Sequence, residues 1–171
     1  MRTLVALLVI LVSLVLVLLL GLRLAAVIRE VGVLPVRLPE EGSIVETSLG
    51  PIYVEALGPP DGPPVLLVHG SVGWSRMWRP TQVALAAAGY RAIAFDMPPM
   101  GWSFRDPAAD YSRQTQATRL LALVEALKIR PVLVAHSFGA GAAAEAALRQ
   151  PDALAGLVVV SGAIGLGADG A

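Results

Sequence analysis

The chain has 171 residues, of which 56% are hydrophobic and 15% are charged, and it contains no cysteine. Its 13 basic and 13 acidic side chains balance, so the composition does not indicate the strongly basic surface that binds nucleic acid. The absence of cysteine excludes disulfides, thiolate metal sites and a cysteine nucleophile within this sequence.

The apolar residues are concentrated at the N-terminus. Residues 4–20 carry no charge and only Ser13 as a polar side chain, and the next two residues extend the run to 19. At 1.5 Å per residue, a helix of this length crosses a bilayer. We therefore expect a membrane anchor over residues 1–28, which would make the protein single-pass. A cleaved signal peptide is the alternative, because Arg2 supplies a basic residue before the run. The arginines on the two sides of the run do not decide on which side of the membrane the remainder lies.

A linker and then a folded domain are expected after the apolar run. Residues 29–42 contain Pro35 and Pro39 and show no helical period, which is typical of a linker. The folded domain is expected over residues 43–171. It begins with two short predicted strands, at residues 43–48 and 52–57.

Strands and helices alternate through the rest of the chain. Short, continuous apolar runs, each typical of a strand buried on both faces, occupy residues 65–68, 92–95, 132–135 and 157–160. Segments rich in Ala and Leu lie between them and predict helices at residues 77–88, 112–128 and 138–149. This alternation predicts an α/β fold with a mostly parallel sheet and helices on both faces.

Residues that follow the predicted strands are candidates for a functional site, because sites in such sheets form outside the carboxyl ends of the strands. One of these positions carries Ala135-His136-Ser137-Phe138-Gly139, between a predicted strand and an Ala-rich helix. This context is typical of a nucleophile elbow, in which small residues flank a serine on a sharp, strained turn. Without the flanking motifs, Ser137 would more often be a turn or N-cap residue.

Three motifs together resemble the N-terminal part of the α/β-hydrolase fold family. They are His69-Gly70 after one strand, DMPPMGWS at residues 96–103 after the next, and AHSFGA at residues 135–140. Their order and spacing resemble the family over residues from about 43 to 171. The second motif departs from the family pattern D-x-P-G-x-G-x-S only at Pro99, which stands in place of glycine. The resemblance implies an incomplete α/β-hydrolase core that stops after the sixth strand.

The same resemblance implies roles for particular residues. Ser137 would be the nucleophile, and the backbone N–H groups of Phe138 and Ser71 would form the oxyanion hole. Gly70 and Gly139 would support their motifs, Gly139 as one of the small residues that the sharp turn at the serine requires. His69 would support the oxyanion loop, and Asp96 would fix its own loop as a hydrogen-bond acceptor. The resemblance implies no metal and no organic cofactor, and it implies a small acyl compound as substrate.

Two sets of side chains have less certain roles. His136 adjoins the serine in sequence, but neighbouring side chains on a sharp elbow point in different directions, so we expect it to pack rather than to act as a base. Trp74, Trp78 and Trp102 lie near predicted strand ends and fit either a pocket lining or the core.

The partners that would activate Ser137 are not evident. In the family, an acid and then a histidine follow the serine along the chain, whereas here only Glu145, Asp152 and Asp169 follow it, with no histidine. A serine hydroxyl is a weak nucleophile without a base. We therefore expect a partial sequence of a membrane-anchored serine hydrolase that acts on an ester or related acyl substrate. The alternative is a catalytically inactive, hydrolase-like binding or interaction protein tethered to the membrane. Protein partners are not indicated.

Overall fold

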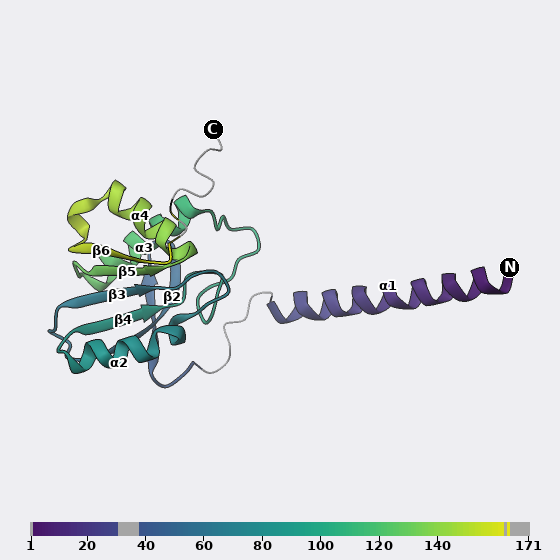
Figure 1. Ribbon diagram of the computed structural model, residues 1–171, viewed down its shortest axis with the longest axis horizontal. Coiled ribbons are helices and arrows are strands. Elements are labelled where there is room, and N and C mark those ends of the chain that lie inside the picture. Colours follow the sequence, from purple (N-terminus) through teal and green to yellow (C-terminus); the bar gives the residue numbers. More distant parts are fainter. Residues whose placement is uncertain (1, 31–37, 163, 165–171) are drawn as a thin grey trace. The chain divides into compact units, whose positions relative to one another are not determined.

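The computed structural model describes residues 2–30, 38–162 and 164 (Figure 1). The chain forms two compact units, Met1–Val33 and Leu34–Ala171, and each is described by itself. The first contains helix α1 (Arg2–Glu30). Its segment Val5–Val27 has a mean hydropathy of 3.3. By length and composition α1 is able to cross a membrane, and a signal sequence meets the same description.

The second unit is built on a six-stranded sheet with the strand order β1-β2-β4-β3-β5-β6. The two strands at one edge are antiparallel to their neighbours, and the four remaining strands run parallel to one another. The strands are β1 (Gly42–Thr47), β2 (Gly50–Leu57), β3 (Pro64–Val68), β4 (Arg91–Phe95), β5 (Val132–His136) and β6 (Gly156–Val160). The predicted α/β class with a mostly parallel sheet is therefore confirmed, with an antiparallel pair added at one edge.

Helices cover both faces of this sheet (Figure 1). The helices are the 3-10 turn η1 (Ser75–Trp78), α2 (Arg79–Ala87), α3 (Arg113–Leu127), α4 (Phe138–Arg149) and the 3-10 turn η2 (Pro151–Ala153). Alternate side chains of β3 pack on opposite faces of the sheet. Leu66 and Val68 belong to the apolar cluster that also contains residues of α3 and α4. Val65 and Leu67 join the cluster that contains Trp78 and, from α2, Leu85. The apolar runs are continuous because both faces of each central strand are buried.

The element boundaries differ from the prediction at two informative places. The helix expected from residue 77 begins at Arg79, because Ser75–Trp78 form a 3-10 turn first. Pro80 lies in the first turn of α2, where its missing N–H costs no hydrogen bond. Strand β5 continues one residue further than expected, to His136, so α4 follows after the single residue Ser137. Half of the expected linker, residues 31–37, lies outside the described residues, and α1 extends to Glu30 within the expected linker.

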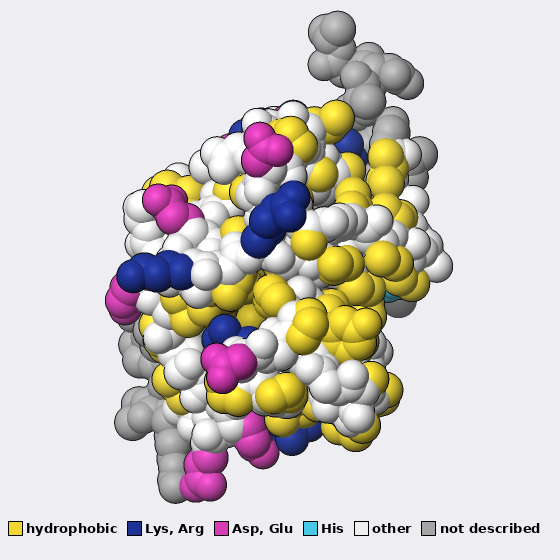
Figure 2. Space-filling view, turned by 90° about the vertical axis from the view of Figure 1, so that its left-hand side faces the viewer, with side chains coloured by type: hydrophobic (Ala, Val, Ile, Leu, Met, Phe, Trp, Pro, Cys, Tyr) yellow, Lys and Arg dark blue, Asp and Glu magenta, His cyan; other side chains and the backbone are white. Residues whose placement is uncertain are grey.

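The surface carries charges of both signs. On the end of the molecule drawn in Figure 2, acidic and basic side chains are interspersed, and hydrophobic side chains gather toward the right-hand side of the view. In the outer strand β6, Val158, Val159 and Val160 are 48%, 42% and 38% exposed. An outer strand with apolar side chains and unpaired backbone groups is a template for pairing with another chain.

We expect a lysine on β6 to reduce self-association of the detergent-solubilised chain. Val159→Lys places a charge beside the free strand edge, and light scattering after size-exclusion chromatography should show a shift from oligomers toward monomer. Leu148→Lys is the matched control, because Leu148 is an apolar residue that is 82% exposed and belongs to α4 rather than to β6. An equal shift in both variants would show that general solubility, rather than the edge of β6, controls association.

Candidate active site

Ser137 occupies a one-residue turn between β5 and α4 in an unusual backbone conformation. Its φ is 51° and its ψ is −121°, a combination that side-chain-bearing residues rarely adopt. The Ser137 N–H donates to the Val160 carbonyl at 3.1 Å, and the Ser137 carbonyl accepts from the Ala140 N–H at 3.1 Å. Its side chain makes no capping hydrogen bond to α4. The strained turn is therefore held by its neighbours, and the hydroxyl is not used as an N-cap.

The space around Ser137 explains why the flanking residues are small. Ala135 and Gly139 are fully buried or nearly so. A Cβ on Gly139 would lie far inside van der Waals contact with the His69 carbonyl oxygen and 2.9 Å from Val68 Cγ1. A Cβ on Gly70 would lie 2.9 Å from both Ser137 Cβ and His136 Nδ1. The end of β3 and the start of α4 thus approach each other through two glycines.

The turn after β3 is called the oxyanion turn here and comprises residues 69–73. It is closed by a hydrogen bond of 3.2 Å from the Gly73 N–H to the Gly70 carbonyl. The contact of Gly70 with Ser137 places this turn beside the elbow. Ser71 therefore lies in the turn that adjoins the serine, and Phe138 is the first residue of α4, whose amino end carries partial positive charge. Their N–H groups as oxyanion donors stay a prediction.

His69 is fully buried, and both of its ring nitrogens have partners. Nε2 accepts the Met97 N–H at 2.8 Å, so Nδ1 carries the proton and donates to the Gly70 carbonyl at 2.7 Å. Burial, the largest cause, lowers the pKa of His69 below its ordinary value of 6.5. A neutral imidazole with both nitrogens engaged agrees with the expected supporting role and leaves no free nitrogen for Ser137.

We expect the stability of the domain to fall between pH 7.5 and pH 5 because of His69. Its pKa is lower in the folded than in the unfolded chain, so the unfolded state binds more protons in this window. Its contribution is fully present above pH 6.5 and is lost as the pH falls toward the folded-state pKa. Urea denaturation at both pH values should show the fall, and His69→Asn should be less stable at pH 7.5 but lack this pH dependence. A variant with the parent's full pH dependence would assign the effect to another group.

Asp96 ties together two loops at the carboxyl end of β4. The side chain is fully buried, with Oδ1 accepting the Ser75 N–H at 2.6 Å and Oδ2 accepting the Trp102 N–H at 2.7 Å. Gly101 has a φ of 57° and lies against the Asp96 carboxylate with no room for a Cβ. These contacts agree with the loop-fixing role expected for Asp96.

The remaining residues of this motif contribute contacts that the sequence interpretation did not assign. Ser103 Oγ accepts the Tyr53 N–H at 2.9 Å and donates to the Asp96 carbonyl, which joins the loop to β2. At the position where the family pattern has glycine, the Pro98–Pro99 peptide bond is cis. The side-chain amide of Gln116 on α3 donates to the Pro98 carbonyl. The match to D-x-P-G-x-G-x-S was the signal that could have identified Gly101 and Ser103.

A base for Ser137 is not found among residues 38–162. No carboxylate or imidazole in this range makes a hydrogen bond to the Ser137 hydroxyl, and His136 Nδ1 is buried without a partner. Glu145 pairs with Arg149 at 2.8 Å on the exposed side of α4, and Asp152 is exposed in η2. Asp169 lies outside the described residues. In the described part of the chain, no group of three or more acidic or histidine side chains is arranged to hold a metal ion.

The three tryptophans separate into different environments. Trp78 is 7% exposed and packs against Val65 and Leu67, so it is a core residue. Trp74 is half exposed, and the Trp102 ring lies 6.4 Å from the Tyr53 ring. A surface hollow of about 500 Å³ lies elsewhere, at the C-terminal end of α3 and beside η2, and Ser137 does not line it.

The sheet order, the turn at Ser137 and the two neighbouring loops define the α/β-hydrolase fold, and the comparisons with known proteins agree. The alpha/beta hydrolase fold family matches residues 63–169, so the chain belongs to this family. It is 45% identical over 93 residues to an epoxide hydrolase from Caballeronia sordidicola, a match that covers 53% of this chain and 28% of that protein.

Solved structures show the same fold. An epoxide hydrolase from Vigna radiata has a TM-score of 0.67 at 29% identity, covering 71% of this chain and 39% of its own. A thioesterase domain from the curacin biosynthetic pathway has a TM-score of 0.66 at 28% identity, covering 71% of this chain and 46% of its own. The chain thus spans less than half the length of each of these three relatives.

Proposed function

We propose that this chain is part of a serine hydrolase that acts on an ester or related acyl substrate, with Ser137 as the nucleophile. The single observation that carries the proposal is the strained turn at Ser137, with φ 51° and ψ −121° and a side chain that caps no helix. Strain of this kind is maintained at functional sites when the surrounding structure holds it in place. A serine that served only as a helix cap would not require this conformation.

The proposed reaction is attack of Ser137 Oγ on the carbonyl carbon of the substrate. Charge then develops on the carbonyl oxygen, and the backbone N–H groups of Phe138 and Ser71 would stabilise it. One such donor contributes about 3 to 4 kcal/mol to the transition state in comparable sites. The hydrogen bonds of His69 and Asp96 to the surrounding loops would hold these donors in place before substrate binds.

The proposed reaction requires a base that the described residues do not provide. We propose that the acid and the histidine come from sequence beyond the 171 residues, which agrees with the chain spanning 28% to 46% of the three relatives. We also propose that α1 anchors the protein in a membrane as a single-pass helix, because Val5–Val27 is apolar. An inactive binding protein of the same fold remains the competing proposal.

Epoxide hydrolysis is a second candidate, favoured by the 45% identity to the epoxide hydrolase from Caballeronia sordidicola. Proteins of that class resemble this fold but normally carry an aspartate at the elbow, where this chain has Ser137. A serine forms an acyl-enzyme with esters and thioesters, as the proposal requires. The thioesterase domain among the structural relatives supports this choice, because cleavage of a thioester is an acyl transfer.

Covalent labelling with a fluorophosphonate tests the proposal. The detergent-solubilised 171-residue chain and the product of the reading frame continued past Ala171 are treated in parallel, and mass spectrometry locates the adduct. We expect labelling of Ser137 in the longer product and little or none in the shorter chain. Labelling of neither product would favour the inactive binding protein, and turnover of an epoxide without labelling would favour epoxide hydrolysis.

A further inference from the structure

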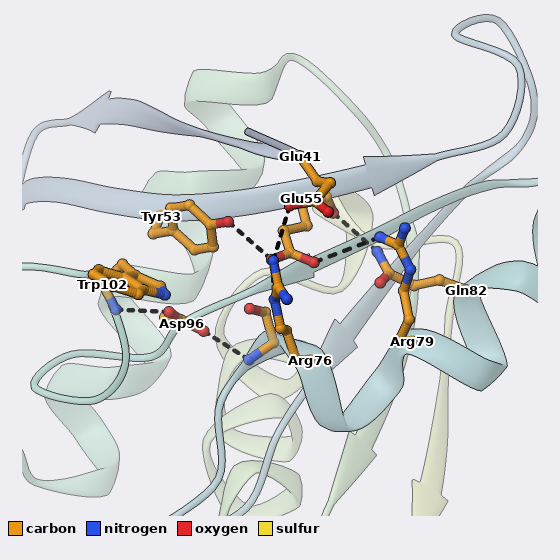
Figure 3. Close-up of polar contacts among 9 residues, drawn as sticks. Glu41, Tyr53, Glu55, Arg76, Arg79, Gln82, Asp96 and Trp102 are labelled. Carbon is orange, nitrogen blue, oxygen red and sulfur yellow. Dashed lines mark hydrogen bonds and ion pairs between the residues drawn. The ribbon is translucent and has the colours of Figure 1, made fainter. Parts of the chain in front are cut away.

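A buried carboxylate lies away from Ser137, beneath the segment that follows the oxyanion turn. Glu55 is on β2 and is 1% exposed, the last of four consecutive buried residues in that strand. Its Oε1 accepts the Tyr53 hydroxyl proton at 2.8 Å and the Arg76 Nε–H at 3.2 Å (Figure 3). Its Oε2 lies 3.8 Å from Arg79 Nη1. Glu55 is therefore surrounded by one phenol and two guanidinium groups.

Tyr53, Glu55, Arg76 and Arg79 are called the Glu55 cluster, and a contribution to folding stability does not explain why it is there. Burying a carboxylate is costly, and an ion pair that compensates it is often no better than packed apolar side chains. Several buried polar atoms around the cluster also lack hydrogen-bond partners within the described residues, which adds to the cost. These atoms are Glu55 Oε2, Ser75 Oγ, Trp78 Nε1 and Gln82 Oε1. What the cluster does provide is a fixed position for the arginines that it holds.

The Tyr53 hydroxyl is a buried hydrogen-bond donor to Glu55. Burial, followed by the hydrogen bond to Glu55, raises the pKa of Tyr53. The phenol thus keeps its proton and stays a donor to Oε1. The ring itself is fully buried, and a Cβ on Gly42 of β1 would overlap its hydroxyl. Tyr53 and Glu55 are accordingly fixed to the sheet rather than to a mobile loop.

Arg76 connects this fixed carboxylate to the oxyanion turn. Arg76 belongs to η1, which begins two residues after the turn ends at Gly73. The turn is held at its start by His69, through the Met97 N–H, and η1 is held at Ser75 by Asp96. Glu55 adds the next attachment along the chain, from η1 to β2. The segment from His69 to Arg76 is therefore attached at three residues, namely His69, Ser75 and Arg76.

We propose that Glu55 is a positioning residue, which acts through Arg76 to hold η1 and so to fix the backbone of Ser71 in the oxyanion turn. The proposal rests on the proposed serine hydrolase function, in which the Ser71 N–H stabilises the developing oxyanion. Glu55 is 1% exposed, so its carboxylate is not open to a substrate. Its effect is on the geometry of a donor, and small displacements of such a donor are costly to catalysis.

Arg76→Gln tests the positioning role, with Glu41→Gln as the matched control. Arg76 is about half exposed, so its replacement leaves the core intact, and Glu55 keeps its pairing with Arg79. Glu41, also about half exposed, is the other carboxylate bound to Arg76, at 2.9 Å. Hydrogen–deuterium exchange of the detergent-solubilised chain should be about tenfold faster over residues 70–77 in Arg76→Gln. Exchange in α3 and β5 should be unchanged, and Glu41→Gln should match the parent throughout.

The labelling kinetics provide a second readout that general destabilisation would not produce. In the product labelled by the fluorophosphonate, Arg76→Gln should lower the maximal labelling rate about tenfold and leave the reagent concentration at half-maximal rate unchanged. Unchanged exchange over residues 70–77, or an equal rise in every segment, would overturn the positioning role. The exchange result alone decides whether Glu55 has the positioning role. If the fluorophosphonate does not label Ser137 in the unsubstituted protein, only the proposed serine hydrolase function is contradicted.

Discussion

Gly139→Ala is expected to destabilise the domain by about 3 kcal/mol, although alanine is the better helix former. Gly139 is the second residue of α4, and an added methyl group would overlap the His69 carbonyl oxygen and approach Val68 Cγ1 at 2.9 Å. A backbone carbonyl at the end of a central strand has little freedom to move. Relief of the overlap would have to separate α4 from β3, which would also displace the oxyanion turn from Ser137.

Helix propensity alone predicts the opposite result for Gly139→Ala. In an ordinary helix interior, replacing glycine by alanine stabilises by about 1 kcal/mol, so propensity and packing predict opposite signs. Urea unfolding followed by tryptophan fluorescence in detergent measures the difference. Gly156→Ala is the control, because a Cβ there would lie 4.0 Å from Val132 Cγ2, an ordinary contact. We expect that variant to remain within about 0.5 kcal/mol of the parent. An unchanged or raised midpoint for Gly139→Ala would refute the close approach of α4 and β3.

The overall fold was predictable because the central strands are buried on both faces. Residues 65–68, 92–95 and 132–135 are continuous apolar runs, and each is the core of a strand that extends it by a residue at one end. Ser112 accepts the Thr115 N–H as the N-cap of α3, which agrees with the expected start of that helix. Each of these signals lies within a single segment, so it can be recognised without knowing which other segments that segment contacts.

Other features depend on contacts between distant segments and could not be read in this way. Glu55 stands in a strand where a charged residue predicts exposure, yet it is buried because Arg76 and Arg79 pack over it from 21 residues or more along the chain. The start of α2 was misplaced because the hydrogen bond of Ser75 to Asp96 favours a 3-10 turn there. The motif around Ser137 predicts a site, but the geometry around that serine is set by the ends of four separate strands, β3, β4, β5 and β6.

Contacts from neighbouring segments hold the backbone of Ser137 in its unusual conformation. The Val160 carbonyl holds the Ser137 N–H, and Gly70 lies against its side chain. His69 and Asp96 fix the two neighbouring loops by accepting the N–H groups of Met97 and Ser75. A backbone conformation that is unfavourable by itself persists only when such contacts determine it. Replacing the serine should therefore affect stability and activity separately.

Ser137→Ala and Ser137→Gly are expected to abolish activity alike but to differ in stability. Without the hydroxyl no acyl-enzyme forms, so hydrolysis by the product of the continued reading frame should fall by a factor of about 10⁴ or more, and labelling should disappear. Hydrolysis that survives in either variant would refute Ser137 as the nucleophile.

The stability of the two variants tests the origin of the strain. Alanine keeps the cost of a φ of 51°, whereas glycine adopts this conformation freely. Strain at such a residue costs about 1 to 3 kcal/mol, and part of the gain is offset by the greater freedom of glycine in the unfolded chain. Urea unfolding should thus find Ser137→Gly about 1 kcal/mol more stable than Ser137→Ala. Equal stabilities would mean that the turn stores no strain, and the conformation of Ser137 would then cease to support a catalytic role.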